Sequence, residues 1–274
     1  MQKTAFKSTW PEALSDPSGR RQAKPRTTGQ TMVIDKGLGL HSFTDILTTS
    51  GEYIDIIKFG FGTSPLYPLP VIRSKIELAN KHRIQVIPGG TLLEAAVRLD
   101  LIPGFFRQVT ELGFTGIEVS DGTINLSRSL RNELIKDAKS LGLKVFTEYG
   151  KKLFGSRINV YDFATTVEQD LACGAELVTV EARESGLGVG LFDEQGDCRD
   201  EDLSEIINAV SDRNRILWEA PLKDQQVMLI KTLGPDVHLG NIAPQEVITL
   251  ESIRRGLRSD TFELQQVPYF DYMI

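Results

Sequence analysis

Short apolar segments rich in β-branched residues alternate with helical patterns along almost the whole of this 274-residue chain. The apolar segments predict strands, because their hydrophobicity is nearly continuous, as it is in strands covered on both faces. The predicted strands are Thr31–Lys36, Tyr53–Phe59, Ile84–Ile87, Gly116–Ser120, Leu143–Glu148, Leu177–Glu181, Arg215–Glu219 and Val237–Ile242. Strands of this kind require helices on both faces of a parallel sheet.

The segments between these strands have the periodicity of amphipathic helices. The segment Ser127–Leu141, for example, places Leu130, Leu134 and Ala138 on one face and ends at Gly142, a common helix stop. The other predicted helices are Thr44–Thr49, Val71–Lys81, Phe105–Leu112, Val160–Cys173, Glu201–Val210, Lys223–Leu233 and Pro244–Leu257. Eight strands that alternate with eight helices predict an α/β protein with a single (β/α)8 TIM barrel.

The main alternative is an open, doubly wound sheet. Such a sheet normally carries a Gly-x-Gly-x-x-Gly phosphate turn after its first strand. The glycine-rich segments Gly37-Leu38-Gly39, Gly60-Phe61-Gly62 and Gly186–Gly190 all lack the third glycine at the required offset. We therefore favour the barrel.

The ends of the chain differ in composition from the barrel. Residues 1–28 are rich in basic residues and proline and lack apolar periodicity, which predicts an irregular arm on the surface. Residues 29–262 form the predicted catalytic barrel, and residues 263–274 a C-terminal tail. The apolar tail from Val267 to Ile274 could dock on a neighbouring subunit or on its own barrel, so a homo-oligomer is left open.

The charge and the cysteine content restrict the class of partner. A net charge of −6 and a pI near 5.3 favour neither nucleic acid nor an anionic membrane. No apolar run approaches the roughly 18 residues of a membrane span, and the first residues contain no signal-peptide hydrophobic region. Cys173 and Cys198 lack the spacing of a disulfide framework or a zinc site. We expect a cytoplasmic protein that acts on small molecules.

Polar residues follow every predicted strand, at the end where a TIM barrel has its active site. Four of them are glutamates in similar local sequences: Glu118, Glu148, Glu181 and Glu219. Each could be a structural ion-pair partner, but together they could hold Mg²⁺, which prefers oxygen ligands. Which of them would bind the metal stays open, because Mg²⁺ often uses only one or two protein ligands.

The same strand ends carry the groups expected to bind substrate. Lysine and arginine suit an anionic substrate such as a phosphate or a carboxylate, and the Gly89-Gly90-Thr91 turn could offer backbone N–H groups to an oxyanion. The candidates are Asp35, Lys36, Lys58, Gly90, Thr91, Arg183 and Asn241. No Ser-His-Asp set and no catalytic cysteine accompany them.

The motifs at the strand ends, taken in order, resemble those of the phosphosulfolactate synthase family. They are Asp35-Lys36-Gly37, Lys58–Ser64, Pro88–Leu92, Glu118–Gly122, Thr147–Lys152, Glu181–Gly186, Glu219-Ala220-Pro221, Asn241-Ile242 and Leu250–Phe262. The resemblance covers about residues 25–262 without large gaps. It also implies a (β/α)8 barrel, in agreement with the strand pattern.

The resemblance implies a Mg²⁺-dependent lyase that adds sulfite to phosphoenolpyruvate and forms (2R)-phospho-3-sulfolactate. In that chemistry sulfite attacks the methylene carbon, charge moves into the carboxylate, and a general acid protonates C2. The resemblance assigns the acid to Lys152. We expect the pKa of Lys152 to be lowered by Lys151 and by partial burial.

Two other functions remain open. Plant heat-stress-associated proteins resemble the same barrel but depart from several of the motifs, and because this chain keeps them we favour a catalyst. A Schiff-base aldolase that uses Lys58 or Lys152 also fits the barrel. It predicts that borohydride traps a carbonyl substrate on the enzyme, which the synthase does not.

Overall fold

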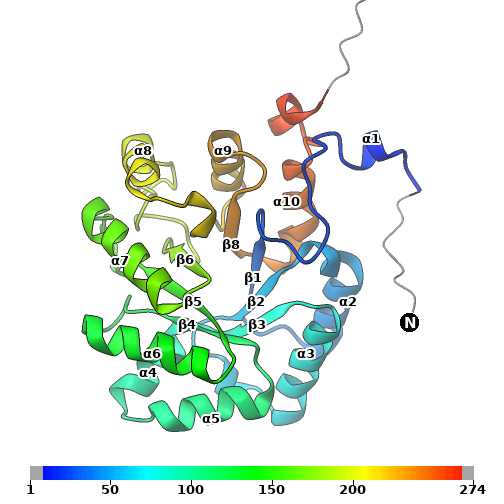
Figure 1. Cartoon of the computed structure of the whole chain (residues 1–274). Coiled ribbons are helices and arrows are strands. Elements are labelled where there is room, and N and C mark those ends of the chain that lie inside the picture. Colours follow the sequence, from blue (N-terminus) through cyan, green and yellow to red (C-terminus); the bar gives the residue numbers. More distant parts are fainter. Residues whose placement is uncertain (1–8, 267–274) are drawn as a thin grey trace, which may run out of the picture.

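The computed structural model describes residues 9–266, and its eight strands form one parallel sheet that curls into a barrel (Figure 1). The strands are β1 (Thr31–Asp35), β2 (Ile56–Phe59), β3 (Gln85–Pro88), β4 (Gly116–Val119), β5 (Lys144–Tyr149), β6 (Leu177–Val180), β7 (Ile216–Glu219) and β8 (His238–Ile242). They are paired in the order β3-β2-β1-β8-β7-β6-β5-β4. Between β3 and β4, the backbone N–H of Thr115 donates to the carbonyl of Val86 at 3.0 Å and nearly closes the ring. The predicted (β/α)8 fold is confirmed.

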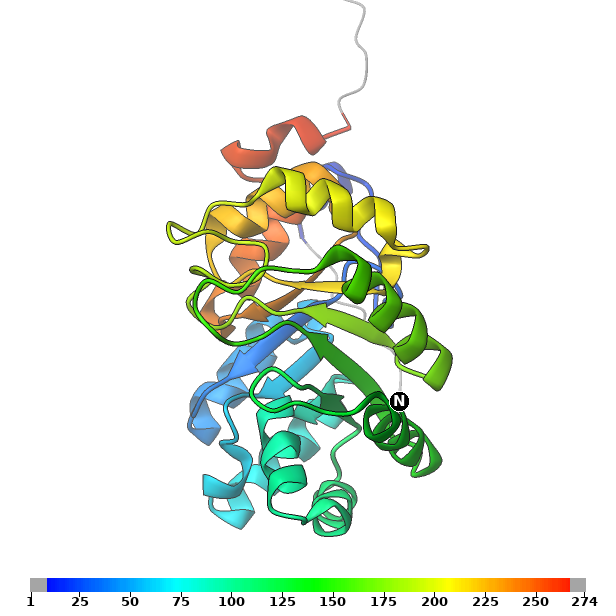
Figure 2. The same cartoon turned by 90° about the vertical axis from the view of Figure 1, so that its left-hand side faces the viewer.

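The helices lie outside the strands and cover the outer face of the sheet (Figures 1 and 2). They are α2 (Leu40–Ser50), α3 (Leu69–Lys81), α4 (Gly90–Arg98), α5 (Ile102–Leu112), α6 (Arg128–Ser140), α7 (Val160–Cys173), α8 (Asp200–Ala209), α9 (Lys223–Leu233) and α10 (Val247–Arg254). Helix α4 was not predicted, because its pattern is short and ends only a few residues before α5. The segment expected as Pro244–Leu257 begins with a separate 3₁₀ turn, η4 (Pro244–Glu246), since Pro244 lies at its first turn.

Two apolar layers stabilise this arrangement. The larger lies between the sheet and the helices, and the smaller fills the barrel interior. The interior layer consists of Met32, Ile56, Ile87, Phe146, Leu177 and Leu217, all at most 5% exposed. Because side chains alternate along a strand with a period of two, the inward residues that follow this layer face the carboxyl end of the barrel. The apolar layer therefore forms a floor beneath that end.

The described part of the N-terminal arm crosses the opposite end of the barrel. It contains a short helix, α1 (Glu12–Ser15), and two buried ion pairs join it to the barrel. Arg21 contacts Glu251 at 2.9 Å, and Arg26 contacts Asp55 at 3.1 Å. The division into arm, barrel and tail stays a prediction, and the tail residues proposed to dock, 267–274, lie outside the described residues.

None of the helices within residues 9–266 is long and apolar enough to cross a membrane.

Candidate active site

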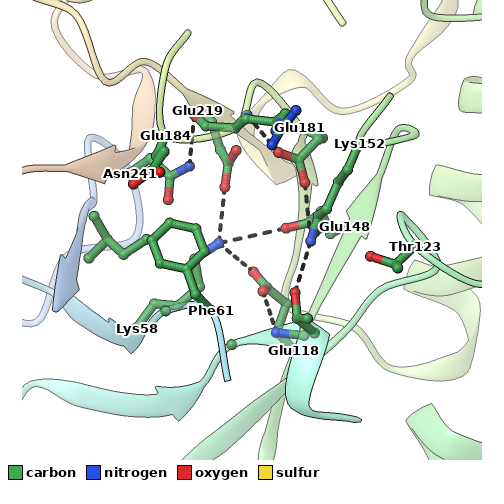
Figure 3. A pocket seen from close by; sticks show the side chains of 16 residues that line it. Lys58, Phe61, Glu118, Thr123, Glu148, Lys152, Glu181, Glu184, Glu219 and Asn241 are labelled. Carbon is green, nitrogen blue, oxygen red and sulfur yellow. Dashed lines mark hydrogen bonds and ion pairs between the residues drawn. The ribbon is translucent and has the colours of Figure 1, made fainter. Parts of the chain in front are cut away.

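A cavity of about 300 Å³ opens at the carboxyl end of the barrel (Figure 3). Most of the predicted site residues line it: Lys58, Gly90, Thr91, Glu118, Glu148, Lys152, Glu181, Arg183, Glu219 and Asn241. The strand period explains why they meet. Lys58, Glu148 and Glu219 each lie two positions after a residue of the interior floor, and so they face the same interior one layer higher.

Lys58 lies at the centre of the carboxylate cluster, as Figure 3 shows. Its Nζ is 3.1 Å from Glu118, 3.0 Å from Glu219 and 3.6 Å from Glu148, and its side chain is 5% exposed. Burial alone would lower the pKa of Lys58, but the surrounding carboxylates raise it well above its usual value. Lys58 is therefore an ammonium ion whose contacts in this structure are with protein carboxylates.

Lys152 enters the cluster from the loop after β5. Its Nζ lies 2.9 Å from Glu148, 3.4 Å from Glu181 and 3.3 Å from the hydroxyl of Thr91. Burial alone would lower the pKa of Lys152, but Glu148 and Glu181 raise it above its usual value. The expectation of a lowered pKa was wrong, because Lys151 does not crowd this ammonium group.

Lys151 points out of the cavity instead. Its Nζ donates to the backbone carbonyls of Asp121 at 2.6 Å and Ile124 at 3.1 Å, and to the side chain of Asn125 at 3.0 Å. Consecutive residues in an extended loop direct their side chains to opposite sides. The two lysines of the motif consequently have different surroundings, and only Lys152 faces the carboxylates.

The four glutamates differ in how much of their hydrogen-bonding capacity the protein uses. Glu118 contacts Lys58 with one oxygen and accepts from the backbone N–H of Gly90 at 2.8 Å with the other. Glu219 likewise contacts Lys58 and accepts from the N–H of Ala182 at 3.0 Å. Both oxygens of each carboxylate are therefore engaged within the protein.

Glu148 and Glu181 form a contrasting pair. Burial would raise the pKa of Glu148, but Lys152 and Lys58 outweigh it and lower that pKa. Burial, followed by the charge of Glu148, raises the pKa of Glu181 well above its usual value. Glu148 Oε1 and Glu181 Oε2 each contact the ammonium of Lys152, and a side-chain hydrogen bond between the two carboxylates also lowers the pKa of Glu148 and raises that of Glu181. In the residues described, neither of these two oxygens accepts from a backbone N–H or a hydroxyl, which leaves them open to a bound cation.

Arg183 and Asn241 lie at the rim of the cavity, and both adopt positive φ, 60° and 55°. The Asn241 amide donates to the backbone carbonyl of Arg183 at 3.3 Å, while its own Oδ1 is buried without a hydrogen bond. The guanidinium of Arg183 forms no ion pair or hydrogen bond within residues 9–266. Glu184, the next residue along the chain, contacts Lys36 at 3.2 Å rather than Arg183.

Asp35 and Lys36 are not part of the cavity wall. Asp35 is buried in an ion pair with Lys75, and its Oδ1 accepts hydrogen bonds from the backbone of Gly37 and Leu38, both at 2.9 Å. Lys36 is half-exposed and paired with Glu184. In this structure Asp35 shapes the loop after β1, and Lys36 lies outside the cavity.

Comparison with known proteins identifies the family. A family model described as (2R)-phospho-3-sulfolactate synthase (ComA) matches residues 19–260. The chain belongs to the phosphosulfolactate synthase family. Phosphosulfolactate synthase of Methanothermobacter thermautotrophicus is 41% identical to it over 88% of this chain and 94% of the relative. The enzyme of that name from Methanocaldococcus jannaschii is 42% identical over 85% and 94%.

Two further proteins are similar to this chain at lower identity. Protein HEAT-STRESS-ASSOCIATED 32 of Arabidopsis thaliana is 24% identical over 91% of this chain and 94% of the relative, well below the identity to the synthases. Among solved structures, 3-hexulose-6-phosphate synthase from Salmonella typhimurium superposes with a TM-score of 0.52 at 16% identity, over 86% of this chain and 97% of that chain. At that identity the likeness shows the barrel fold alone.

Several residues that line the cavity of this synthase family member were not among the predicted site residues: Ile34, Gly60, Phe61, Thr123 and Glu184. All but Ile34, which belongs to β1, lie in loops beyond the strand ends, where no periodicity points to them. Glu94 was missed as well, although it is buried on α4 and accepts from the backbone of Thr123 and Ile124, both at 2.9 Å. Glu94 fixes the position of the loop that carries Thr123. Predicting helix α4 from the sequence would have pointed to this residue.

Proposed function

We propose that this chain catalyses the Mg²⁺-dependent addition of sulfite to phosphoenolpyruvate, which gives (2R)-phospho-3-sulfolactate. The observation that carries the proposal is the position of Lys152, a protonated lysine in the wall of a carboxylate-lined cavity whose rim holds Arg183, an arginine with no ion-pair partner in the part of the chain that the structure describes. The substrate has a phosphate and a carboxylate, which suit Arg183, and the reaction consumes one proton. Membership of the synthase family supports the same reaction.

A magnesium ion would be held by Glu148 and Glu181 rather than by all four glutamates. No group of three acidic, histidine or cysteine residues within residues 9–266 is arranged to hold a metal ion. Two carboxylates suffice for Mg²⁺, which keeps several water ligands, and Glu148 and Glu181 each have a buried oxygen to which no backbone N–H or hydroxyl within residues 9–266 donates. When bound, the ion would stabilise negative charge that develops on the substrate carboxylate.

The residues of the chain would supply the remaining steps. Sulfite forms a bond from sulfur to C3 of phosphoenolpyruvate, and the electrons of the C2–C3 double bond move towards the carboxylate. The Nζ of Lys152 then donates a proton to C2, which completes the addition across the C2–C3 double bond. The carboxylates around Lys152 raise its pKa and keep it protonated before the reaction, as a general acid requires.

A direct assay tests the proposal. Purified protein is incubated with phosphoenolpyruvate, sulfite and Mg²⁺, and the mixture is followed by ³¹P NMR. We expect a new phosphate ester that requires sulfite and is lost when EDTA removes the metal. Absence of this product under all conditions would refute the proposed function and favour a role like that of the heat-stress-associated relative.

The Schiff-base alternative is less well supported by the site. A Schiff base needs a neutral amine, whereas the pKa values of Lys58 and Lys152 are both raised by neighbouring carboxylates. Borohydride treatment in the presence of a carbonyl substrate should therefore leave the mass of the protein unchanged. We also propose a cytoplasmic location and small molecules, rather than nucleic acid or membranes, as partners, in keeping with the net charge of −6.

A further inference from the structure

A second cavity lies at the opposite end of the barrel from the candidate active site. Its volume is about 450 Å³, larger than that of the site at the carboxyl ends of the strands. The amino-terminal ends of β2, β3, β5, β6 and β7 form most of its wall, and residues 24–28 of the arm complete it. The arm therefore encloses a space that is separate from the carboxylate cluster.

The wall of this second cavity is strongly positive. It contains five basic side chains and two acidic ones, which leaves an excess of three positive charges in a protein whose net charge is −6. The basic residues are Lys24, Arg26, Arg83, Lys144 and Arg215, and the acidic ones are Asp55 and Glu176. A local excess opposite in sign to the charge of the whole protein concentrates anions in the cavity.

The two carboxylates do not neutralise the remaining cations. Asp55 is paired with Arg26 at 3.1 Å and also accepts from the backbone of Thr31 at 2.9 Å. Glu176 is paired with Lys139 at 3.4 Å, and Lys139 lies outside the cavity wall. Both acidic groups are thus already engaged.

Three of the basic side chains have no carboxylate partner in the described part of the chain. Within residues 9–266, the side chains of Arg83 and Lys144 form no ion pair or hydrogen bond. Lys24 donates only to the backbone carbonyls of Gly51 at 2.8 Å and His82 at 3.2 Å. Burial lowers the pKa of Lys24 to about 8, although the negative charge of Asp55 acts in the opposite direction, while the positive charges of Arg26 and Arg83 act with burial. A bound anion would favour the charged form of Lys24.

We propose that the cavity at the amino-terminal end of the barrel binds a small anion that carries phosphate groups and at least two negative charges. The planar guanidinium of Arg83 can bind a phosphate through two N–H donors, and Lys24 and Lys144 add point charges. Because Lys24 belongs to the arm and Arg83 and Lys144 to the barrel, the bound anion also joins the arm to the barrel. This site is separate from the one that performs the proposed reaction.

Isothermal titration of the full chain with pyrophosphate tests the proposal. We expect the double variant Arg83→Met/Lys144→Met to bind pyrophosphate at least tenfold more weakly at this site than the wild type. The matched control is Arg98→Met/Lys136→Met, which removes the same charges from exposed helix positions outside the cavity. The control should keep wild-type affinity, and Arg183→Met, at the other end of the barrel, should also bind pyrophosphate in the second cavity with wild-type affinity.

Either of two results would overturn the proposal: equal affinity in the wild type and the cavity variant, or an equal loss in the matched control. Hydrogen exchange of the wild type provides a second measurement that does not depend on a variant. Pyrophosphate should slow the exchange of residues 24–30, and unchanged exchange there would also refute the site. The kcat and KM of the proposed reaction, measured without pyrophosphate, should be unchanged in the cavity variant, so failure of that reaction is a separate outcome.

Discussion

At the scale of single residues, the candidate active site brings buried lysines and buried glutamates into contact. Desolvation of a carboxylate or an ammonium group costs several kcal/mol unless an opposite charge compensates it. Lys58 and Lys152 provide part of this compensation for four glutamates, and the pKa values of Glu118 and Glu181 stay raised because burial outweighs it. Lys152 is left protonated, and Arg183 has no partner among residues 9–266, so these two residues are the ones whose removal should affect catalysis most directly.

Lys152→Met should abolish most of the proposed synthase activity while leaving the fold intact. General acid catalysis typically contributes about 10²–10⁴-fold in rate, and methionine has no proton to donate. The measurement is kcat for product formation, with substrate binding followed separately by titration. Lys151→Met is the matched control, because that lysine contacts only the neighbouring loop and should keep near-normal kcat. If Lys152→Met keeps more than about a tenth of the activity, another residue is the acid.

Arg183→Met should weaken the binding of phosphoenolpyruvate. The guanidinium lines the cavity without an ion-pair partner among residues 9–266, so a substrate anion is the partner that its position allows. A charged hydrogen bond of this kind contributes about 1.5–3 kcal/mol, so we expect KM to rise by about 10–100-fold. Lys36→Met, which breaks only the exposed pair with Glu184, should change KM little. Unchanged kinetics of Arg183→Met would show that Arg183 does not contact the substrate.

At the scale of elements, the strands determine which residues can share the cavity. The apolar floor and the charged layer above it occupy the same inward positions of the strands, two or four residues apart. Strand β8 contributes no side chain to the floor, because Gly240 occupies its inward position. A Cβ at Gly240 would overlap Leu217 Cδ2 and lie 2.8 Å from Met32 Cε. The packing of the floor therefore depends on the absence of a side chain at Gly240 in β8.

Gly240→Ala should destabilise the barrel, although it adds a single methyl group. Overpacking of a filled core costs about 1–3 kcal/mol, and the neighbours of Gly240 are all buried. Urea denaturation would measure the free energy of unfolding. Gly104→Ala in α5 is the matched control, because its new Cβ would have only Arg107 at 3.9 Å as a neighbour. That change should stabilise the protein by about 0.5–1 kcal/mol, and equal effects at the two positions would contradict the packing argument.

At the scale of the whole molecule, hydrogen bonds of the last strand, β8, join it to the start of β1 and to the segment before β7. His238 in β8 is buried and links two distant segments: its Nδ1 accepts from the N–H of Gln30 at 3.2 Å, and its Nε2–H donates to the carbonyl of Asn214 at 3.0 Å. Both bonds require the neutral imidazole with its proton on Nε2. Arg254, also buried, donates to the carbonyls of Pro235 and Val237 and adds a positive charge beside this ring.

The stability of the molecule should consequently fall in mild acid. Burial, followed by the charge of Arg254, lowers the pKa of His238 from 6.5 to about 4. The unfolded chain therefore binds more protons between these values, so this contribution is complete above about pH 6.5 and is lost as the pH falls towards 4. Between pH 7 and pH 5 the loss should be about 2 kcal/mol.

Urea denaturation of His238→Gln at the same two pH values isolates this effect. Glutamine keeps a donor and an acceptor but does not titrate, so the stability of the variant should change less between pH 7 and pH 5 than that of the wild type. His41→Gln, at an exposed position in α2, is the control: its stability should change between pH 7 and pH 5 as much as that of the wild type. If His238→Gln keeps the full pH dependence, other groups are responsible for it.

The sequence by itself determined the class of fold and most of the charged residues that line the cavity, but not Asp35 and Lys36, which lie outside it. Apolar runs that alternate with helical patterns are a local property, and so is the two-residue period that directs Glu148 and Glu219 to the side already taken by Phe146 and Leu217. Only the tertiary structure decided what each charged residue does. The raised pKa of Lys152, the engagement of Glu118 and Glu219 by Lys58, and the burial of Asp35 against Lys75 depend on neighbours contributed by other strands. Desolvation and Coulomb interactions act between groups that are close in space, and the strand pattern does not specify which groups those are.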